Sequence, residues 1–443
     1  MTDQPSAAAD QAWPAKGAGY YALTIVILAT MLNFFDAGVF GMMAQRIKVD
    51  FALSDEQLGW LIGPANVIFF LMIGIPLARL VDIYPRKFVL AGGIALIGLL
   101  TMIGALAQNF KQVFVSRMFV GVSGSAHAPG AYSILSDFFP PLKLPRAIGF
   151  LQIGYIGGTA LGMILGGVLV TWAATQDPII WMGLTIRGWQ MILIAVGAPG
   201  LLIAVLMLFI QEPPRHGVKE PGKSLPIATV LREIGARKGF YIPMFVGLAL
   251  ANTEAQGLMS WRVPFLVRTY GWNEARIGLL SGPLFLVASL LGAFLGTLFV
   301  EWIAKRRKDA NVRATVIMMV CAIPFAVSAP LMPSGELSLA MSTIGGMFGI
   351  GSAVPQNSAI QRVTPNEMRG QVTAIYLFFF IVSSALGSLF IGMMTDRIFH
   401  NEADLWKAMS GIALVLLPMA AIAFWFGIKP YGREVERLEA LGG

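Results

Sequence analysis

Twelve apolar stretches recur along the chain, and each is long enough to cross a bilayer as a helix. A hydrocarbon core about 30 Å thick needs roughly 20 apolar residues per helix. Of the 443 residues, 56% are hydrophobic and only 13% are charged, whereas a soluble protein carries about a quarter charged residues. The sequence therefore predicts an all-α membrane protein with twelve transmembrane helices.

The predicted helices form two sets of six around one polar segment. Their expected ranges in the first set are 20–42, 59–80, 87–108, 113–138, 147–173 and 188–210. Those of the second set are 240–268, 278–302, 312–333, 338–362, 371–396 and 406–428. We expect two parallel six-helix bundles with an internal pseudo-repeat.

This division predicts five segments. They are a polar N-terminal tail, a first bundle, a central cytoplasmic linker, a second bundle and a cytoplasmic tail, at 1–19, 20–210, 211–239, 240–428 and 429–443. In the linker, Ile227, Val230, Leu231 and Ile234 recur at helical spacing, which predicts a short amphipathic helix. It would lie at the inner interface or act as a simple tether.

Charge sets the expected orientation and excludes several classes. Most Lys and Arg fall in loops on the side of both termini, which the positive-inside rule assigns to the cytoplasm. The net charge of +8 therefore reflects topology rather than nucleic-acid binding. The single cysteine, three scattered histidines and absence of a phosphate-binding Gly-rich loop give no support to a metal site, a cofactor or an enzyme.

A charged motif repeats in the two halves. Asp82-Ile-Tyr-Pro-Arg86-Lys87 follows the second predicted helix, and Glu301-Trp-Ile-Ala-Lys305-Arg306 follows the eighth. In both, an acid precedes bases four and five residues later. Parallel repeats of this kind are one of the plans of secondary transporters.

The same loop, together with Arg117-Met-Phe-Val-Gly121, resembles the signatures of the major facilitator superfamily. The resemblance implies two halves that rock between inward-open and outward-open states. Asp82 could accept hydrogen bonds at a neighbouring helix end, and Arg86, beside Lys87, could reach Asp137. These four residues would form an inner latch; the alternative is that the charges only set topology.

Within that superfamily the chain is similar to bacterial spinster-like transporters. The residues that carry the similarity are Asn33-Phe-Phe-Asp36, Leu53-Ser-Asp-Glu-Gln-Leu-Gly59, Ser136-Asp-Phe-Phe-Pro-Pro141 and Thr364-Pro-Asn-Glu-Met-Arg-Gly370. The resemblance implies a lysophospholipid or sphingolipid-like substrate, or a sugar acid as in related branches, and a bacterial inner membrane. Ala37 and Gly124 replace an Arg and a Glu that the family uses.

Three ionisable residues inside predicted helices are candidates for proton coupling: Asp36, His127 and Glu254. A charge in the membrane is costly, so such residues are functional candidates. Asp36 could instead be permanently paired with Arg117, His127 could be a neutral core histidine, and Glu254 could select a substrate.

Other polar residues would line a central cavity, which the resemblance assigns to the first, fourth, seventh and tenth helices. The candidates are Asn33, Arg117, Asn252, Gln256, Gln356, Asn357 and Arg262. For Arg262 an anchoring role at the membrane interface is the alternative. For Gln356 and Asn357 the alternative is hydrogen bonding between helices.

We therefore predict a proton-driven secondary transporter that moves an amphiphilic lipid-type substrate by alternating access. A proton-coupled symporter of a small organic or aromatic acid and an uncoupled facilitator remain open, as does Na⁺ in place of protons. We expect a monomer in the lipid bilayer, with a small-molecule or lipid substrate as its partner and no nucleic acid.

Overall fold

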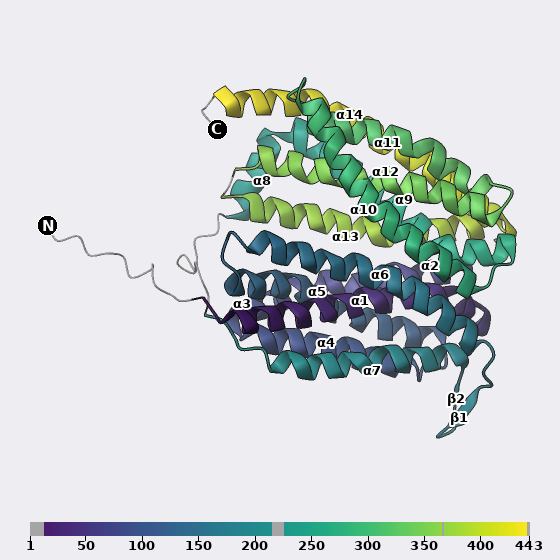
Figure 1. The fold of residues 1–443 in the computed structure, drawn as a ribbon. Helices are drawn as coiled ribbons and strands as arrows, with labels where there is room; N and C mark the ends of the chain where they lie inside the picture. Colours follow the sequence, from purple (N-terminus) through teal and green to yellow (C-terminus); the bar gives the residue numbers. More distant parts are fainter. Residues whose placement is uncertain (1–12, 215–225, 366, 441–443) are drawn as a thin grey trace. The chain divides into compact units, whose positions relative to one another are not determined.

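A computed structural model describes residues 13–214, 226–365 and 367–440, except the side chains of residues 75, 76, 78, 79, 81, 82, 123, 125, 126 and 227. The first half holds α1 (Lys16–Asp50), α2 (Asp55–Ile62), α3 (Pro64–Ile83), α4 (Arg86–Gly104), α5 (Phe110–Phe138), α6 (Leu144–Ala173) and α7 (Gly188–Leu208). A hairpin of β1 (Ile179–Trp181) and β2 (Leu184–Ile186) joins α6 to α7 (Figure 1).

The second half begins with the short linker helix α8 (Ile227–Ala236). The long helices that follow are α9 (Lys238–Tyr270), α10 (Glu274–Ala304), α11 (Ala310–Ser328), α12 (Gly335–Val363), α13 (Arg369–Met394) and α14 (Leu405–Ala440). Three short helical turns lie between them: η1 (Ala329–Leu331), η2 (Thr395–Phe399) and η3 (Glu402–Asp404). With α2 and α3 taken as one span, the prediction of twelve helices is confirmed.

Ten helices of the described chain are long and apolar enough to cross a membrane. The other two long helices are α5, with 29 residues, and α9, with 33. They fall below the others in apolarity because each carries polar residues within its span: Arg117 and His127 in α5, and Asn252 and Glu254 in α9. The two least apolar spans are thus the ones that hold most of the candidate site.

The chain divides into two compact units. Unit 1 comprises Met1–Gly38, Ile68–Gly162 and Gln176–Lys223. Unit 2 comprises Val39–Val67, Met163–Thr175 and Ser224–Gly443. The ends of α1 and α6 and the whole of α2 therefore pack with the second half of the chain.

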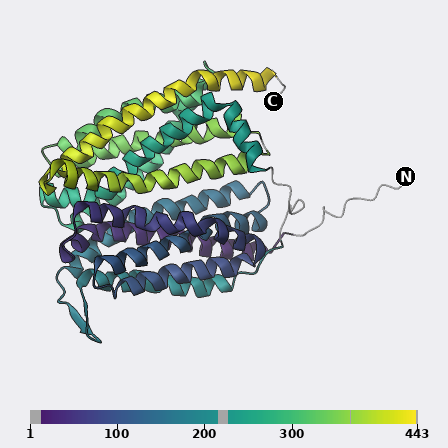
Figure 2. The same cartoon turned by 180° about the vertical axis from the view of Figure 1, so that it is seen from behind.

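In unit 1, α4 packs against both α5 and α7. Buried residues of α1, α4, α5 and α7 form its apolar core, among them Val26, Ile94, Ile134 and Met207. The hairpin projects from one end of this unit, as the reverse view also shows (Figure 2). Such a core holds the polar side chains of α1 and α5 inside the bundle.

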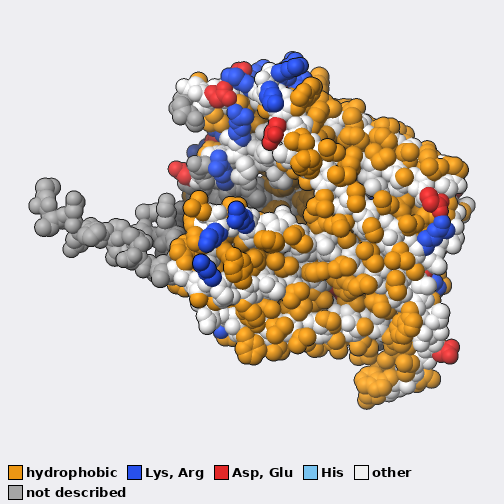
Figure 3. All heavy atoms as spheres, viewed as in Figure 1, with side chains coloured by type: hydrophobic (Ala, Val, Ile, Leu, Met, Phe, Trp, Pro, Cys, Tyr) orange, Lys and Arg blue, Asp and Glu red, His pale blue; other side chains and the backbone are white. Residues whose placement is uncertain are grey.

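In unit 2, α9 packs against α13 and α14, and α12 against α10 and α11. Phe240, Tyr241, Phe424 and Tyr431 are fully buried where α9 meets α14. The linker helix α8 buries Val230 in the same core. Lys and Arg side chains gather over α8 and the C-terminal end of α14, whereas the sides of the helices are mostly hydrophobic (Figure 3).

The predicted span 59–80 is in fact two helices, because the chain breaks at Gly63, between α2 and α3. A Cβ at Gly63 would lie 1.9 Å from Ser388 Oγ and 2.7 Å from the Ala385 carbonyl oxygen. Only glycine fits there, so α2 can approach α13 closely.

A second close approach predicts a stability effect. A Cβ at Gly387 of α13 would lie 1.9 Å from the Thr253 carbonyl oxygen of α9. We expect Gly387→Ala to lower the free energy of unfolding by about 1–3 kcal/mol, because overpacking forces the two helices apart. Thermal unfolding in detergent measures it. Gly349→Ala is the control: its Cβ would meet no atom within 4 Å, so its midpoint should stay the same or rise.

Candidate functional site

The first polar group of unit 1 is a buried ion pair. Arg117 of α5 donates from Nη1 to Asp36 Oδ2 of α1 at 2.8 Å. Thr101 of α4 donates to the other carboxylate oxygen at 3.2 Å. Residues of three helices therefore meet at the Asp36 carboxylate. The ion pair offsets much of the free-energy cost of placing two charges among apolar residues. This is the paired arrangement that the sequence left open as an alternative for Asp36.

His127 of α5 is buried beside Thr30 of α1, with Nε2 2.8 Å from Thr30 Oγ1. Thr30 also lies 2.8 Å from the Val26 carbonyl oxygen, to which it donates its hydroxyl proton. Nε2 then carries a hydrogen and donates to the Thr30 oxygen. Nδ1 has no hydrogen-bond partner among the described residues, so it is the atom at which this imidazole could take up a proton.

Gly124 is the position at which the resemblance to spinster-like transporters implies a Glu. A Cβ at Gly124 would lie 3.5 Å from Asn33 Nδ2 of α1. The Asn33 amide thus lies beside the position that the carboxylate would occupy. No acid accompanies Arg117 from this position, and Asp36 is its ion-pair partner.

The polar turn of α9 in unit 2 is anchored on one side to α13. Asn252 donates to the Phe380 carbonyl at 2.7 Å and to Ser383 Oγ at 2.9 Å. Thr253 donates to the Ser383 carbonyl at 3.2 Å. Glu254, the next residue, is also buried, yet it has no hydrogen bond or ion pair within the described part of the chain. An unpaired buried carboxylate is the most unusual polar group of this helix.

Arg262 lies two turns further along α9 and lines a small pocket of unit 2. The pocket walls include Phe265, Leu339 and Met409, and Ser338 and Ser342 of α12 supply the polar side chains beside Arg262. Arg262 is half-buried and has no ion-pair partner in the residues that the structure describes. A guanidinium held this way can bind a carboxylate or a phosphate.

The amides expected in the cavity differ in their surroundings. Gln356 is buried and donates to Ser352 Oγ one turn back at 3.1 Å. Asn357 is exposed and donates to the Ala353 carbonyl at 3.2 Å. Gln256 is half-buried on α9. These bonds are local to α12, so they leave the role of Gln356 and Asn357 open.

Two residues of the expected latch, Arg86 and Asp137, meet within unit 1. Arg86 is buried and hydrogen-bonds to Asp137 of α5, and its Nε donates to Glu212 at 2.9 Å. Glu212, which follows α7, also accepts from the backbone N–H groups of Arg86 and Lys87 at 3.0 and 3.1 Å. The side chain of Asp82 lies outside the described residues. We call Arg86, Asp137 and Glu212 the Arg86 cluster; it joins α4, α5 and the end of α7.

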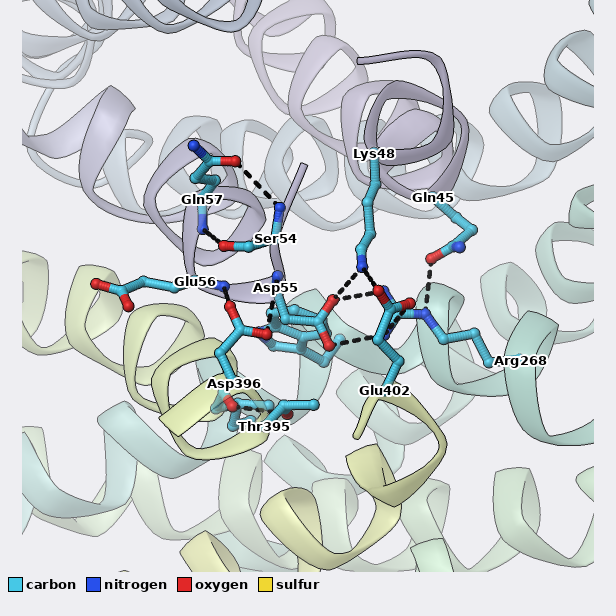
Figure 4. Close-up of polar contacts among 12 residues, drawn as sticks. Gln45, Lys48, Ser54, Asp55, Glu56, Gln57, Arg268, Thr395, Asp396 and Glu402 are labelled. Atoms are coloured by element: carbon cyan, nitrogen blue, oxygen red, sulfur yellow. Dashed lines mark hydrogen bonds and ion pairs between the residues drawn. The ribbon is translucent and has the colours of Figure 1, made fainter. Parts of the chain in front are cut away.

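A second ionic group, which the sequence analysis missed, lies in unit 2. Asp55 at the start of α2 is fully buried and accepts hydrogen bonds from Nη2 and Nη1 of Arg268 in α9, at 2.8 and 2.9 Å. Lys48 at the end of α1 lies 2.9 Å from Asp55 and 2.6 Å from Glu402 of η3. Figure 4 shows both cations directed at the Asp55 carboxylate. We call Asp55, Lys48, Arg268 and Glu402 the Asp55 cluster.

Residues of η2, which follows α13, bind the start of α2 beside the Asp55 cluster. Asp396 of η2 accepts the backbone N–H groups of Asp55 and Glu56, at 3.3 and 2.6 Å (Figure 4). Arg397 donates to both carboxylate oxygens of Glu56, at 2.8 and 2.6 Å. An acid at a helix N-terminus is favoured by the unsatisfied N–H groups there. The start of α2 is thus fixed to α9, η2 and η3.

The sequence analysis includes Asp55 only within a resemblance motif and does not single out Glu212. The signal available was Ser54-Asp-Glu-Gln57, whose capping box predicts a helix start. That signal locates α2, but it does not reveal that Arg268 and Glu402, far away in the chain, would meet Asp55.

A family model described as Major Facilitator Superfamily matches residues 26–388. The chain therefore belongs to the major facilitator superfamily, and it is an integral membrane transporter rather than an enzyme.

Several individual proteins are similar to this chain over much of its length. An MFS-type efflux pump of Mycolicibacterium smegmatis is 26% identical over 96% of this chain and 94% of its own length. Protein spinster of Drosophila melanogaster is 22% identical over 74% of this chain and 52% of its own length. The solved bacterial homologue of the human lysosomal transporter Spinster, inward-facing and unoccupied, has a TM-score of 0.78 at 23% identity, covering 96% of this chain and 98% of that one. The predicted resemblance to spinster proteins is confirmed.

The Asp55 cluster predicts a difference between two carboxylates. Asp55→Asn should lower the free energy of unfolding by about 3–5 kcal/mol, because it leaves buried cations without their main partner. Glu402, whose side chain is 60% exposed, contacts the same Lys48 from solvent, so Glu402→Gln should cost at most about 1 kcal/mol. Thermal unfolding of both variants measures the two effects. Equal losses would contradict the central place of Asp55.

Proposed function

We propose that this chain is a proton-driven secondary transporter working by alternating access, with Glu254 as the group that carries the proton. The observation that supports this proposal is the burial of Glu254 without a partner in the described residues. An ionised carboxylate in an apolar bundle is costly unless it is paired. Its charge therefore penalises any state in which it is shut away from water.

This energetic penalty couples the protonation of Glu254 to the conformation of the transporter. When Glu254 is ionised, a conformation that gives it water is favoured; when it is protonated, a conformation that buries it costs less. A ligand shifts a conformational equilibrium only by its differential affinity for the two states, and here the proton is that ligand. His127, with its free Nδ1, is a second candidate by the same argument, because an imidazolium buried in an apolar bundle is also costly.

Asp36 has a different role in this proposal. Its carboxylate already contacts Arg117 and Thr101, and both states of the transporter can keep that pair. We assign Asp36 and Arg117 to the wall of the substrate path, where a substrate anion could compete for Arg117. As further substrate-contacting residues we propose Asn33 of unit 1, and Asn252, Gln256, Gln356 and Asn357 of unit 2.

For the substrate we propose an amphiphilic molecule of lipid type. The similarity to spinster proteins and to an efflux pump supports it. The second candidate is a small organic acid. Arg262 favours it as a cation without a described partner, and so does the similarity to the hexuronate transporter of Escherichia coli, 23% identical over 65% of this chain.

We further propose that the Asp55 cluster is the outer gate and the Arg86 cluster part of the inner latch. Lys and Arg are in excess in the loops on the side of the two termini, away from the Asp55 cluster. This excess supports an orientation in a bacterial inner membrane with both termini in the cytoplasm. In that orientation the Asp55 cluster holds the periplasmic ends of α1, α2 and α9 together. Opening outward would then require Asp55 to part from Arg268.

The test is proton flux in proteoliposomes that contain a pH-sensitive dye. A lysophospholipid, a hexuronate and 4-hydroxybenzoate are added separately to wild type, to Glu254→Gln and to protein-free vesicles. We expect the lysophospholipid to evoke a flux in wild type at least tenfold above that of Glu254→Gln, because the amide cannot exchange a proton. Glu336→Gln removes a carboxylate at the exposed end of α12 and is the matched control, with flux unchanged.

The outcomes separate the alternatives. Proton flux evoked only by the hexuronate or the aromatic acid would contradict a lipid-type substrate and support an acid symporter. Uptake of labelled lysophospholipid without proton flux would identify an uncoupled carrier. Full proton flux in Glu254→Gln would remove Glu254 from the mechanism.

A further inference from the structure

An apolar groove lies on the side of unit 2, between α13 with η2 and α14. It encloses about 370 Å³, and its walls include Phe390, Met394 and Ile398 on one side and Gly411 and Val415 on the other. From Phe390 to Ile398 the wall extends about 12 Å at a rise of 1.5 Å per residue. The groove therefore runs along about two turns of α13 and η2.

The groove opens toward the bilayer. Phe390, Val415 and Ile398 are 40%, 54% and 63% exposed, and they lie on spans of a membrane protein. Exposed apolar side chains on a membrane-spanning helix contact acyl chains of the bilayer. A groove between such side chains loses van der Waals contacts unless an acyl chain fills it.

Arg397 is the one charged residue among the groove's described lining residues. It lies in η2, where the α-helix of α13 gives way to a π-helical turn that ends at His400. Its side chain is 61% exposed. Nε and Nη2 donate to Glu56, whereas Nη1 has no hydrogen bond to any residue the structure describes. A guanidinium with free donors therefore lies at one end of an apolar groove.

We propose that this groove binds an anionic phospholipid of the surrounding bilayer, with an acyl chain along α13 and α14 and the phosphate on Arg397. The chemistry matches at both ends: the groove is apolar, and a guanidinium binds phosphate through paired N–H donors. The site is separate from the substrate path around Glu254 and does not depend on what is transported.

Glu56 sets the strength of the site. Its carboxylate pairs with the guanidinium that would hold the phosphate, so its negative charge opposes the lipid. The two partners of this one ion pair should therefore have opposite effects: loss of Arg397 weakens lipid binding, and loss of Glu56 strengthens it. A lipid bound there would also compete with the contact between α2 and η2.

The experiment is native mass spectrometry of the full chain released from bilayers that contain equal amounts of phosphatidylglycerol and phosphatidylcholine with identical acyl chains. We expect wild type to retain phosphatidylglycerol in about tenfold excess, as a charge-assisted contact allows. Arg397→Gln should bring the two lipids to equal retention, and Glu56→Gln should increase the excess. Gly411→Phe should remove both, because its side chain would fill the groove next to the flexible end of Met394.

Gly92→Phe is the matched control, since Gly92 is exposed on α4 and a Cβ there meets no atom within 4 Å. Thermal midpoints show that each variant is folded, and Arg397→Lys, which keeps the charge, should retain part of the excess if Arg397→Gln does not fold. Equal retention of the two lipids by wild type, or unchanged retention in Gly411→Phe, would overturn the proposal. So would changes in the same direction for Arg397→Gln and Glu56→Gln, because a purely structural ion pair predicts that result.

Discussion

The cost of a charge inside a membrane governs this molecule more than any single packing contact. A hydrocarbon environment offers an ion neither water nor counter-ions, so a charged side chain is kept there only with a partner or for a function. Asp36 and Arg117 satisfy this constraint by pairing across three helices of unit 1. On α9, Glu254 and Arg262 have no such partner among the described residues. The proposed transport chemistry follows from that contrast between a paired and an unpaired carboxylate.

The same constraint explains the ends of the helices. Asp55, Lys48 and Arg268 are buried or nearly so, and each is charged. They are tolerated because every charge meets an opposite one, with Asp396 adding acceptors for the start of α2. The Arg86 cluster is built on the same principle within unit 1. A buried ion pair adds little net stability, although removing one partner alone is costly. Such contacts can form in one state and separate in another.

Much of the fold could be predicted from the sequence because apolar runs of bilayer length leave little choice of structure. Helix ends such as Phe138, Ala173 and the start of α7 at Gly188 match their predicted positions. The break at Gly63 could not be predicted so directly. It depends on the close approach of α13, a contact between segments more than 300 residues apart in the sequence.

The candidate site likewise contains residues that the sequence predicts and residues that it does not. Intramembrane ionisable residues such as Glu254 are visible in the sequence because they interrupt apolar runs. Asp55 and Glu212 lie at helix ends, where an acid is ordinary, so composition gives no reason to single them out. Their importance comes from partners that only the fold brings near: Arg268 and Lys48 for Asp55, and Arg86 for Glu212.

The central claim is that protonation of Glu254 changes which end of the transporter is open. Electron spin resonance distances in lipid test it, with spin labels in a Cys321→Ser background. One label pair replaces Lys111 and Thr269, and the other replaces Lys143 and Lys305. Between pH 8 and pH 5 we predict opposite population shifts for the two pairs in wild type. Glu254→Gln should show the acidic distribution at both pH values. Distributions in wild type that do not change with pH, or a full pH response in Glu254→Gln, would contradict the account.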